Sequence, residues 1–227
     1  MNKNTWFRTL LVVIGLNLLL ACSVISSVAS YSVTDQQIEQ VLSIPDISTS
    51  HGLRNRAILE VLYSTGIRRN ELVHIKVNDI NFNKGTVFIG EGKGKRDRVV
   101  PIGARALLWV ERYLYGVRPS FLGLEVNEYL FLGERGRELQ QEQLGQIVKR
   151  CLILAGHDKP GLCCHLFRHT MATSMLENDA DIRHIQSMLG HRDITSTQIY
   201  THVAIGKLKE VHSKCHPAKL KEKKVVA

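Results

Sequence analysis

The chain has 227 residues, of which 44% are hydrophobic and 22% charged, as expected for a globular protein with an apolar core. Its formal net charge is +9 at pH 7, which favours a polyanionic partner. The five cysteines are an odd number with no Cys-x-x-Cys pair, which argues against a disulfide framework and a zinc ribbon and fits a reducing compartment.

The first 31 residues differ in character from the rest. A basic start precedes an apolar run over residues 10–21 and then Cys22. This pattern is typical of a secretory signal, and Leu19-Leu20-Ala21-Cys22 resembles a bacterial lipoprotein lipobox. Extended over residues 10–28, the run is nearly long enough to span a bilayer, so membrane contact there is one prediction.

Several interpretations of this leader stay open. It could export an anchored lipoprotein of unrelated function, or it could anchor a basic domain on the cytoplasmic side of a membrane. It could also be a leader joined by gene rearrangement, or by a misplaced start codon, to a truncated domain. We favour the last interpretation, because nothing downstream is typical of a secreted protein. We therefore expect a cytoplasmic protein, with a membrane-anchored protein as the alternative.

Helical patterns open the main domain. Thr34 is a candidate N-cap, followed by apolar residues at helical spacing. A second helix is predicted over residues 53–64, and Gly66 would end it as a left-handed C-cap. A new helix is predicted to start near Ile67.

The hydrophobic period then changes. Three short segments rich in β-favouring residues are separated by turn-forming residues: Val77–Phe82, Thr86–Ile89 and Arg98–Pro101. They predict a small antiparallel three-stranded sheet. Helical patterns return over residues 104–117, 141–155, 165–177 and 181–189. The sequence therefore predicts an α+β domain that is mostly helical.

Two segments carry side chains suited to phosphate. His165 and Arg168 are three residues apart, so a helix would place them on one face, and Phe167, Met171 and Met175 would form an apolar stripe away from it. The predicted helix would thus present an imidazole and a guanidinium opposite its buried side. The alternative is an ordinary surface histidine and arginine.

Arg68 lies just past Gly66, near a predicted helix start. Backbone N–H groups there favour an anion, and a guanidinium adds bidentate recognition of phosphate oxygens. Glu71, one turn further, could hold Arg68 in position. The alternative is a surface salt bridge between these two side chains, worth ~0.5 kcal/mol.

Lys93 stands at a predicted hairpin tip between glycines, where a mobile turn could place an ammonium group next to a leaving oxygen. The alternative is a solvated turn lysine. Lys95, Arg96 and Arg98 are competing cations nearby.

Tyr200, taken alone, would be interpreted as a packing residue, and its combination with the other segments changes that interpretation. In chain order, the motifs are TGIRRNEL, GEGKGKRDRVVPIG, HLFRH and LGHRDITSTQIYTH. Together they resemble the catalytic domain of tyrosine recombinases, the phage-integrase and Xer-type family. The resemblance covers about residues 33–205. The predicted organisation is a hydrophobic leader (1–31), the catalytic domain (32–206) and a basic C-terminal tail (207–227).

The resemblance implies six catalytic residues around one phosphate: Arg68, Lys93, His165, Arg168, His191 and Tyr200. In such a site the two arginines clamp the scissile phosphate and the lysine protonates the departing 5′ oxygen. The first histidine transfers a proton, and the second hydrogen-bonds the phosphate. The tyrosine attacks phosphorus and forms a 3′-phosphotyrosyl link, so no cofactor or metal is expected. Glu71 matches an acidic accessory position.

The implied function is that of a site-specific DNA recombinase or integrase that acts on double-stranded DNA as a homotetramer. The alternatives are a truncated DNA-binding remnant without strand exchange, and DNA relaxation of the type IB topoisomerase kind. Family members carry a helical DNA-binding domain before the catalytic one, whereas about thirty mostly apolar residues precede it in this sequence. We therefore expect weak DNA binding.

Overall fold

A computed structural model describes residues 33–90, 97–122, 126–190 and 203–217. The chain divides after Val33 into two units, and the second, Thr34–Ala227, holds almost all of the described residues. Its helices are α2 Asp35–Ser43, α3 Ser50–Thr65, α4 Arg69–Val73, α5 Ala104–Glu111, α6 Arg118–Leu122, α7 Gln141–Leu154, α8 Cys164–Glu177, α9 Ile182–Leu189 and α10 Val203–Cys215. Short 3₁₀ turns lie at Val77–Asp79 and Glu134–Gly136, and a π-helical stretch at Arg112–Val117.

The first two described helices have the ends that the sequence predicts. The Thr34 hydroxyl accepts from the backbone N–H of Gln37 at 3.3 Å, and the Gln37 side chain accepts from the N–H of Thr34 at 2.9 Å. This reciprocal pair is a capping box. Gly66 closes α3 in the left-handed conformation, with φ at 61°. Both predicted caps are confirmed.

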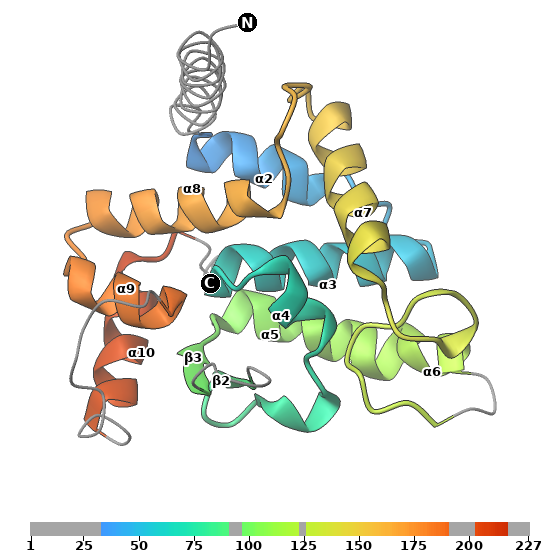
Figure 1. Ribbon diagram of the computed structural model, residues 1–227, viewed down its shortest axis with the longest axis horizontal. Coiled ribbons are helices and arrows are strands. Elements are labelled where there is room, and N and C mark those ends of the chain that lie inside the picture. Colours follow the sequence, from blue (N-terminus) through green and yellow to red (C-terminus); the bar gives the residue numbers. More distant parts are fainter. Residues whose placement is uncertain (1–32, 91–96, 123–125, 191–202, 218–227) are drawn as a thin grey trace, which may run out of the picture. The chain divides into compact units, whose positions relative to one another are not determined.

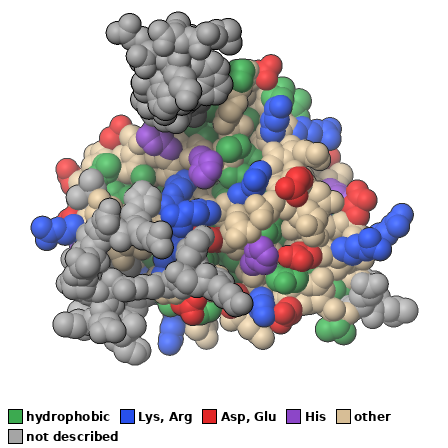
Figure 2. All heavy atoms as spheres, viewed as in Figure 1, with side chains coloured by type: hydrophobic (Ala, Val, Ile, Leu, Met, Phe, Trp, Pro, Cys, Tyr) green, Lys and Arg blue, Asp and Glu red, His purple; other side chains and the backbone are tan. Residues whose placement is uncertain are grey.

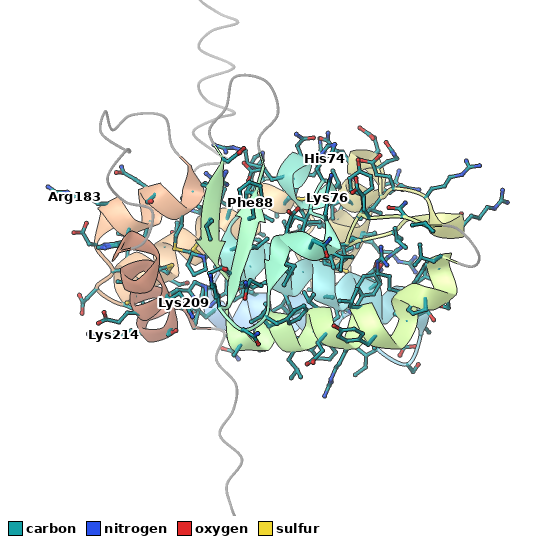
Figure 3. The ribbon with its side chains drawn as sticks, turned by 90° about the horizontal axis from the view of Figure 1, so that it is seen from below. His74, Lys76, Phe88, Arg183, Lys209 and Lys214 are labelled. Carbon is teal, nitrogen blue, oxygen red and sulfur yellow. The ribbon has the colours of Figure 1, made fainter. Side chains whose placement is uncertain are left out.

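The sheet has three antiparallel strands in the order β1 Ile80–Asn81, β2 Thr86–Ile89 and β3 Arg98–Pro101. Val87 pairs with Val100, and both are fully buried. Phe88, labelled on β2 in Figure 3, pairs with Val99 on the opposite, exposed face. The predicted three-stranded antiparallel sheet is confirmed.

The predicted first strand, Val77–Phe82, is too long. Residues 77–79 form a 3₁₀ turn instead, because the carboxylate of Asp79 accepts a hydrogen bond from the backbone N–H of Lys76 at 2.8 Å. An aspartate that bonds the backbone three residues earlier stabilises a turn and competes with a strand. Only Ile80 and Asn81 pair with β2.

The core is built around α3, which packs against α5 on one side and α8 on the other (Figure 1). Ile58 and Leu59 of α3 are fully buried. From α8, the predicted apolar stripe of Phe167, Met171 and Met175 is also fully buried and is therefore confirmed. The domain is an α+β fold, mostly helical, as the sequence predicts.

The predicted helix over residues 104–117 is longer and less regular than expected. It runs as α5, continues through the π-helical stretch Arg112–Val117, and ends in α6. Tyr113 in the π-helical stretch is buried, and its hydroxyl accepts from the backbone N–H of Leu132 at 3.1 Å.

The C-terminal end of the described chain is a helix that packs on α8, α9 and β3. Residues 207–215 of the expected basic tail lie within this helix, α10. His212 and His216 are buried and contact the backbone carbonyls of Ser64 and Tyr63 at 2.6 and 2.9 Å. Figure 3 labels two lysines of α10, Lys209 and Lys214.

Among the residues that the structure describes, no helix combines the length and the hydrophobicity needed to cross a bilayer. The predicted membrane contact falls on residues 10–28, which lie outside the described ranges.

Candidate active site

Arginines from three elements that are distant in the sequence meet at the C-terminal end of α9. Each donates to one of three consecutive backbone carbonyls: Arg98 Nε to Met188 O at 3.1 Å, Arg168 Nη2 to Leu189 O at 2.7 Å, and Arg68 Nη2 to Gly190 O at 3.4 Å. The last carbonyls of a helix have no partner within the helix and carry partial negative charge, so cations bind there favourably. The end of α9 therefore gathers the guanidinium groups in one place.

A buried carboxylate holds two of these arginines. Oε1 of Glu71 accepts from Arg68 Nη1 at 3.0 Å and from Arg98 Nη1 at 3.1 Å. Oε2 accepts from the backbone N–H of Arg68 and from Arg98 Nη2, both at 2.8 Å. The side chain of Glu71 is 6% exposed and that of Arg98 is 12% exposed.

The alternative of a surface salt bridge between Arg68 and Glu71 is therefore wrong. The contact exists, but its carboxylate is buried and shared with a second guanidinium from β3. Removing one partner of a buried ion pair costs about 3–5 kcal/mol, several times the value for an exposed pair. The pair thus fixes the guanidinium of Arg68, which is itself 35% exposed.

Arg168 is more deeply buried than the sequence predicts. We expected α8 to present both an imidazole and a guanidinium, but His165 is exposed whereas Arg168 is buried. The physical reason is that the guanidinium bonds two backbone carbonyls at once, Leu189 O and, through Nη1 at 2.7 Å, Gly66 O. A guanidinium has five N–H donors, and these two bonds use part of that capacity.

Two glycines allow the segments to approach so closely. A Cβ atom on Gly66 would lie 2.1 Å from Met171 Cε, and one on Gly190 would lie 3.1 Å from Arg98 Cζ. Both residues also have positive φ angles, 61° and 64°, which side chains disfavour. The backbone of α3 can therefore reach α8, and the end of α9 can reach Arg98.

The structure describes three of the six predicted site residues, and it places them close to one another or on the same helix. Arg68 and Arg168 meet at the end of α9, and His165 lies one helical turn before Arg168 on α8. On the face seen in Figure 2, Lys, Arg and His side chains gather near the middle of the molecule. Lys93, His191 and Tyr200 lie outside the described residues. In the sequence, His191 directly follows Gly190, which receives the bond from Arg68.

Sequence reasoning missed the role of Arg98. From the sequence, Arg98 is only a cation competing with Lys93, whereas in the structure it lies between Glu71 and α9. Its position in a predicted strand, rather than in the turn before it, was the one available signal. Its partners lie 27 and 90 residues away, so no local pattern could reveal them.

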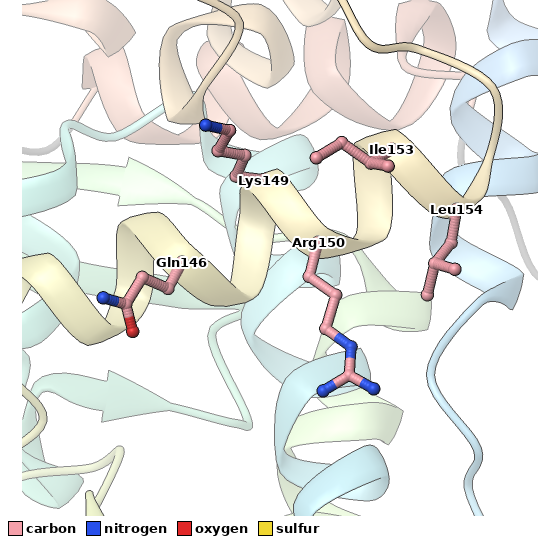
Figure 4. Close-up of a pocket in the computed structure, with 5 residues that line it drawn as sticks. All are labelled: Gln146, Lys149, Arg150, Ile153 and Leu154. Atoms are coloured by element: carbon pink, nitrogen blue, oxygen red, sulfur yellow. The ribbon is translucent and has the colours of Figure 1, made fainter.

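A pocket on α7 lies apart from this arrangement. It is lined by Gln146, Lys149, Arg150, Ile153 and Leu154, all from one helix (Figure 4). None of the predicted site residues contributes to it, and it has no part in the site described above.

The domain is mostly helical, and three of its arginines meet at the end of α9. The model of the phage integrase family matches residues 32–206, and the chain belongs to that family.

Two curated relatives show how similar the sequences are. The tyrosine recombinase XerC 2 of Ralstonia nicotianae is 45% identical over 192 residues, which cover 85% of this chain and 55% of the relative. The tyrosine recombinase XerD of Proteus mirabilis is 39% identical over 184 residues, covering 81% and 58%. The chain thus spans less than two thirds of the length of these relatives.

Solved structures show the same fold. The XerA recombinase superposes with a TM-score of 0.65 at 31% identity, covering 81% of this chain and 62% of that one. The XerH recombinase bound to its difH substrate gives a TM-score of 0.60 at 22% identity, covering 80% and 49%, which supports the fold alone.

Proposed function

We propose that this protein is a site-specific DNA recombinase or integrase that cuts and rejoins DNA strands through a tyrosine nucleophile. The observation that carries the proposal is the meeting of Arg68 and Arg168 at the end of α9, directly before His191 in the sequence. Membership of the phage integrase family and 45% identity to a tyrosine recombinase support it.

The two arginines are assigned to the scissile phosphate. Cleavage of a phosphodiester builds negative charge on the oxygens that do not leave, and donors fixed in advance stabilise that charge without reorganising. Such a donor commonly contributes about 3 kcal/mol to the transition state. The bonds of Arg168 to two carbonyls and of Arg68 to Glu71 supply this fixed geometry.

The remaining roles follow the chemistry of the residue types. The phenol of Tyr200 attacks phosphorus, its Oη–P bond forms, and the bond from phosphorus to the 5′ oxygen breaks. The phenol, with an ordinary pKa near ~10, gives up its proton during the attack. We assign proton transfer to His165, protonation of the 5′ oxygen to Lys93, and a hydrogen bond to the phosphate to His191. Acid–base assistance of this kind adds about 10² to 10⁴ in rate.

The covalent intermediate preserves the energy of the broken bond. A 5′ hydroxyl from another duplex can therefore attack the 3′-phosphotyrosyl link, release Tyr200 and complete strand exchange. Double-stranded DNA is the proposed partner, which the net charge of +9 favours, and a homotetramer is the proposed working assembly. We place this activity in the cytoplasm.

The proposal is tested with a DNA duplex that carries a nick beside the cleavage site, so that the released fragment diffuses away and the covalent adduct accumulates. We expect an adduct that survives denaturing electrophoresis and disappears in Tyr200→Phe. Tyr115→Phe is the matched control, because Tyr115 is 71% exposed on the π-helical stretch, and this variant should form the adduct normally.

Two other outcomes would replace the proposal. DNA binding that weakens with salt, without any adduct, would identify a binding remnant. Relaxation of supercoiled DNA by a monomer, without strand exchange, would identify an activity of the type IB topoisomerase kind.

A further inference from the structure

Arg98 is not among the six predicted site residues, yet it contacts both the carboxylate behind Arg68 and the end of α9. Nη1 and Nη2 bind the two oxygens of Glu71 at 3.1 and 2.8 Å, and Nε donates to Met188 O at 3.1 Å. All three nitrogens of the guanidinium are thus engaged in fixed directions. A lysine, with one compact ammonium group, could not reproduce this geometry.

We infer that Arg98 is a positioning residue for DNA cleavage, acting through the guanidinium of Arg68 and through the backbone that leads into His191. For its effect on cleavage, this inference rests on the proposed function. Arg98 fixes the carboxylate that in turn binds Arg68 Nη1 at 3.0 Å. It also holds the last turn of α9 through Met188 O, and a Cβ atom on Gly190 would lie only 3.1 Å from the Arg98 guanidinium.

The position of Arg98 in the sheet adds a third connection. In the β2–β3 ladder it pairs with Ile89, which is the last pair before the hairpin connection. Lys93 lies in that connection in the sequence, outside the described residues. Arg98 therefore joins the base of the hairpin, α4 and α9, the three segments that carry or precede Lys93, Arg68 and His191.

The bonds of the Arg98 guanidinium separate this role from a direct contact with DNA, because all three of its nitrogens already bind Glu71 or Met188 O. The side chain of Arg98 is 12% exposed, compared with 35% for Arg68. A residue that binds a phosphate directly contributes to affinity and to the salt dependence of binding. A positioning residue should instead change the rate of cleavage and leave both of those quantities as they are.

The chain offers a closely matched control. Arg105 also binds a buried carboxylate, with Nε 2.9 Å from Glu60 Oε2, and its side chain is 14% exposed. It contacts none of the residues at the end of α9 in the bonds described for it, which run to Glu60 and Glu39. Arg98→Gln and Arg105→Gln therefore remove comparable buried ion pairs at different places.

The experiment measures adduct formation on nicked DNA, DNA affinity at several salt concentrations, and thermal unfolding for both variants. At a temperature where both are folded, Arg98→Gln should slow adduct formation by about 10²-fold, the scale expected when reacting groups are misplaced by about 1 Å. Affinity and salt slope should not change, and Arg105→Gln should react at the wild-type rate. An adduct rate for Arg98→Gln within twofold of wild type would overturn the inference, as would a matching loss of affinity.

Coupling to Arg68 gives a sharper criterion. Because Arg98 acts partly through Arg68, adding Arg98→Gln to Arg68→Gln should slow adduct formation by a smaller factor than Arg98→Gln does in the wild-type chain, since neighbouring residues that act together are not additive. Fully multiplicative losses would contradict the inference. Arg98→Lys should recover little of the rate.

Hydrogen exchange separates failure of this inference from failure of the proposed function. In Arg98→Gln the amides in the last turn of α9 should exchange about tenfold faster, the factor expected when one hydrogen bond is removed. Arg105→Gln should leave them unchanged. This result would support the positioning role even for a chain that forms no adduct, and unchanged exchange in Arg98→Gln would overturn it.

Discussion

Two buried carboxylates, Glu60 and Glu71, are each held by two arginines, yet their surroundings differ. Glu60 on α3 is fully buried and binds Arg56 at 2.7 Å and Arg105 at 2.9 Å. Glu71 on α4 binds Arg68 at 3.0 Å and Arg98 at 2.8 Å. The local chemistry of the two clusters is therefore almost the same.

The difference lies in what else the arginines contact. Around Glu60 they bind the backbone at Leu42, the carboxylate of Glu39 and the ring of Trp109, so that α2, α3 and α5 are held together. Around Glu71 they bind the end of α9, where Arg168 also arrives. A buried ion pair thus indicates a candidate functional centre only when its neighbours include other predicted site residues.

The largest expected effect is on the free energy of unfolding. It tests whether the two carboxylates contribute equally to stability while only Glu71 affects cleavage. Glu60→Gln and Glu71→Gln each leave two guanidiniums without their buried counter-charge, so each should lose about 3–5 kcal/mol of unfolding free energy in urea titrations. At a temperature where both remain folded, only Glu71→Gln should slow adduct formation. Equal slowing in both variants would remove the distinction drawn between them.

Arg168→Ala sharpens the same contrast. It should slow adduct formation by about 10² to 10³, as expected for loss of one fixed donor to the developing charge. It should also cost about 1–3 kcal/mol in stability, because the carbonyls of Gly66 and Leu189 lose a partner. DNA affinity should change little, since one phosphate contact is a small share of binding.

Arg56→Ala is the control for that measurement. Arg56 Nη1 donates to Leu42 O at 2.7 Å, so this variant also removes a bond to the backbone, one that is partly buried and does not touch α9. It should lose stability and keep the cleavage rate. If DNA affinity collapses in Arg168→Ala as fully as cleavage does, the phosphate role assigned to Arg168 is wrong.

A smaller effect on stability and cleavage is expected from substitution of Gly190, the glycine that ends α9. Gly190→Ala should cost about 1–2 kcal/mol for the left-handed backbone and displace the Arg98 guanidinium, which lies 3.1 Å from the new Cβ. Gly156→Ala places a Cβ at a φ of 85° with no neighbouring atom within 4 Å. It should show the backbone cost alone. Comparable cleavage rates in the two variants would show that contact with Arg98 is unimportant.

The smallest expected effect concerns pH, and it comes from α10 rather than from either carboxylate cluster. Burial lowers the pKa of His212 below its ordinary value of 6.5, although its bond to Ser64 O opposes this shift. The folded state therefore binds its proton less readily than the unfolded state. The contribution of neutral, buried His212 to the free energy of unfolding is fully present above pH 6.5. It is lost as the pH falls from there through the lowered pKa.

Between pH 7.5 and pH 5.5, the free energy of unfolding should thus fall because of this group. His212→Gln, which keeps a donor for Ser64 O, should flatten the decrease in urea titrations across this range. A pH dependence that is the same in wild type and variant would contradict the assignment to His212.

Local features of the fold could be predicted from the sequence because their causes are local. The cap at Thr34, the left-handed Gly66 and the stripe of Phe167, Met171 and Met175 each depend on residues within a few positions. The first strand was predicted too long because β-favouring residues at its start did not reveal the bond between Asp79 and Lys76.

The site was only partly predictable, for the opposite reason. The motifs predict Arg68, His165 and Arg168 as site residues, but burial of Arg168 and the sharing of Glu71 with Arg98 depend on contacts between segments far apart in the chain. Fixed spacing within a helix cannot show which carbonyls a side chain will reach. The catalytic roles of all six predicted site residues are proposals, and those of Lys93, His191 and Tyr200 rest on the sequence alone.

The most direct test of the account is to locate the DNA on the protein. The adduct formed on nicked DNA is digested with nuclease and trypsin, and the modified peptide is sequenced by mass spectrometry. We expect a nucleotide linked to Tyr200, the single tyrosine in the tryptic peptide of residues 193–207. A nucleotide on any other residue, or an unmodified Tyr200 in a chain that has cleaved DNA, would contradict it.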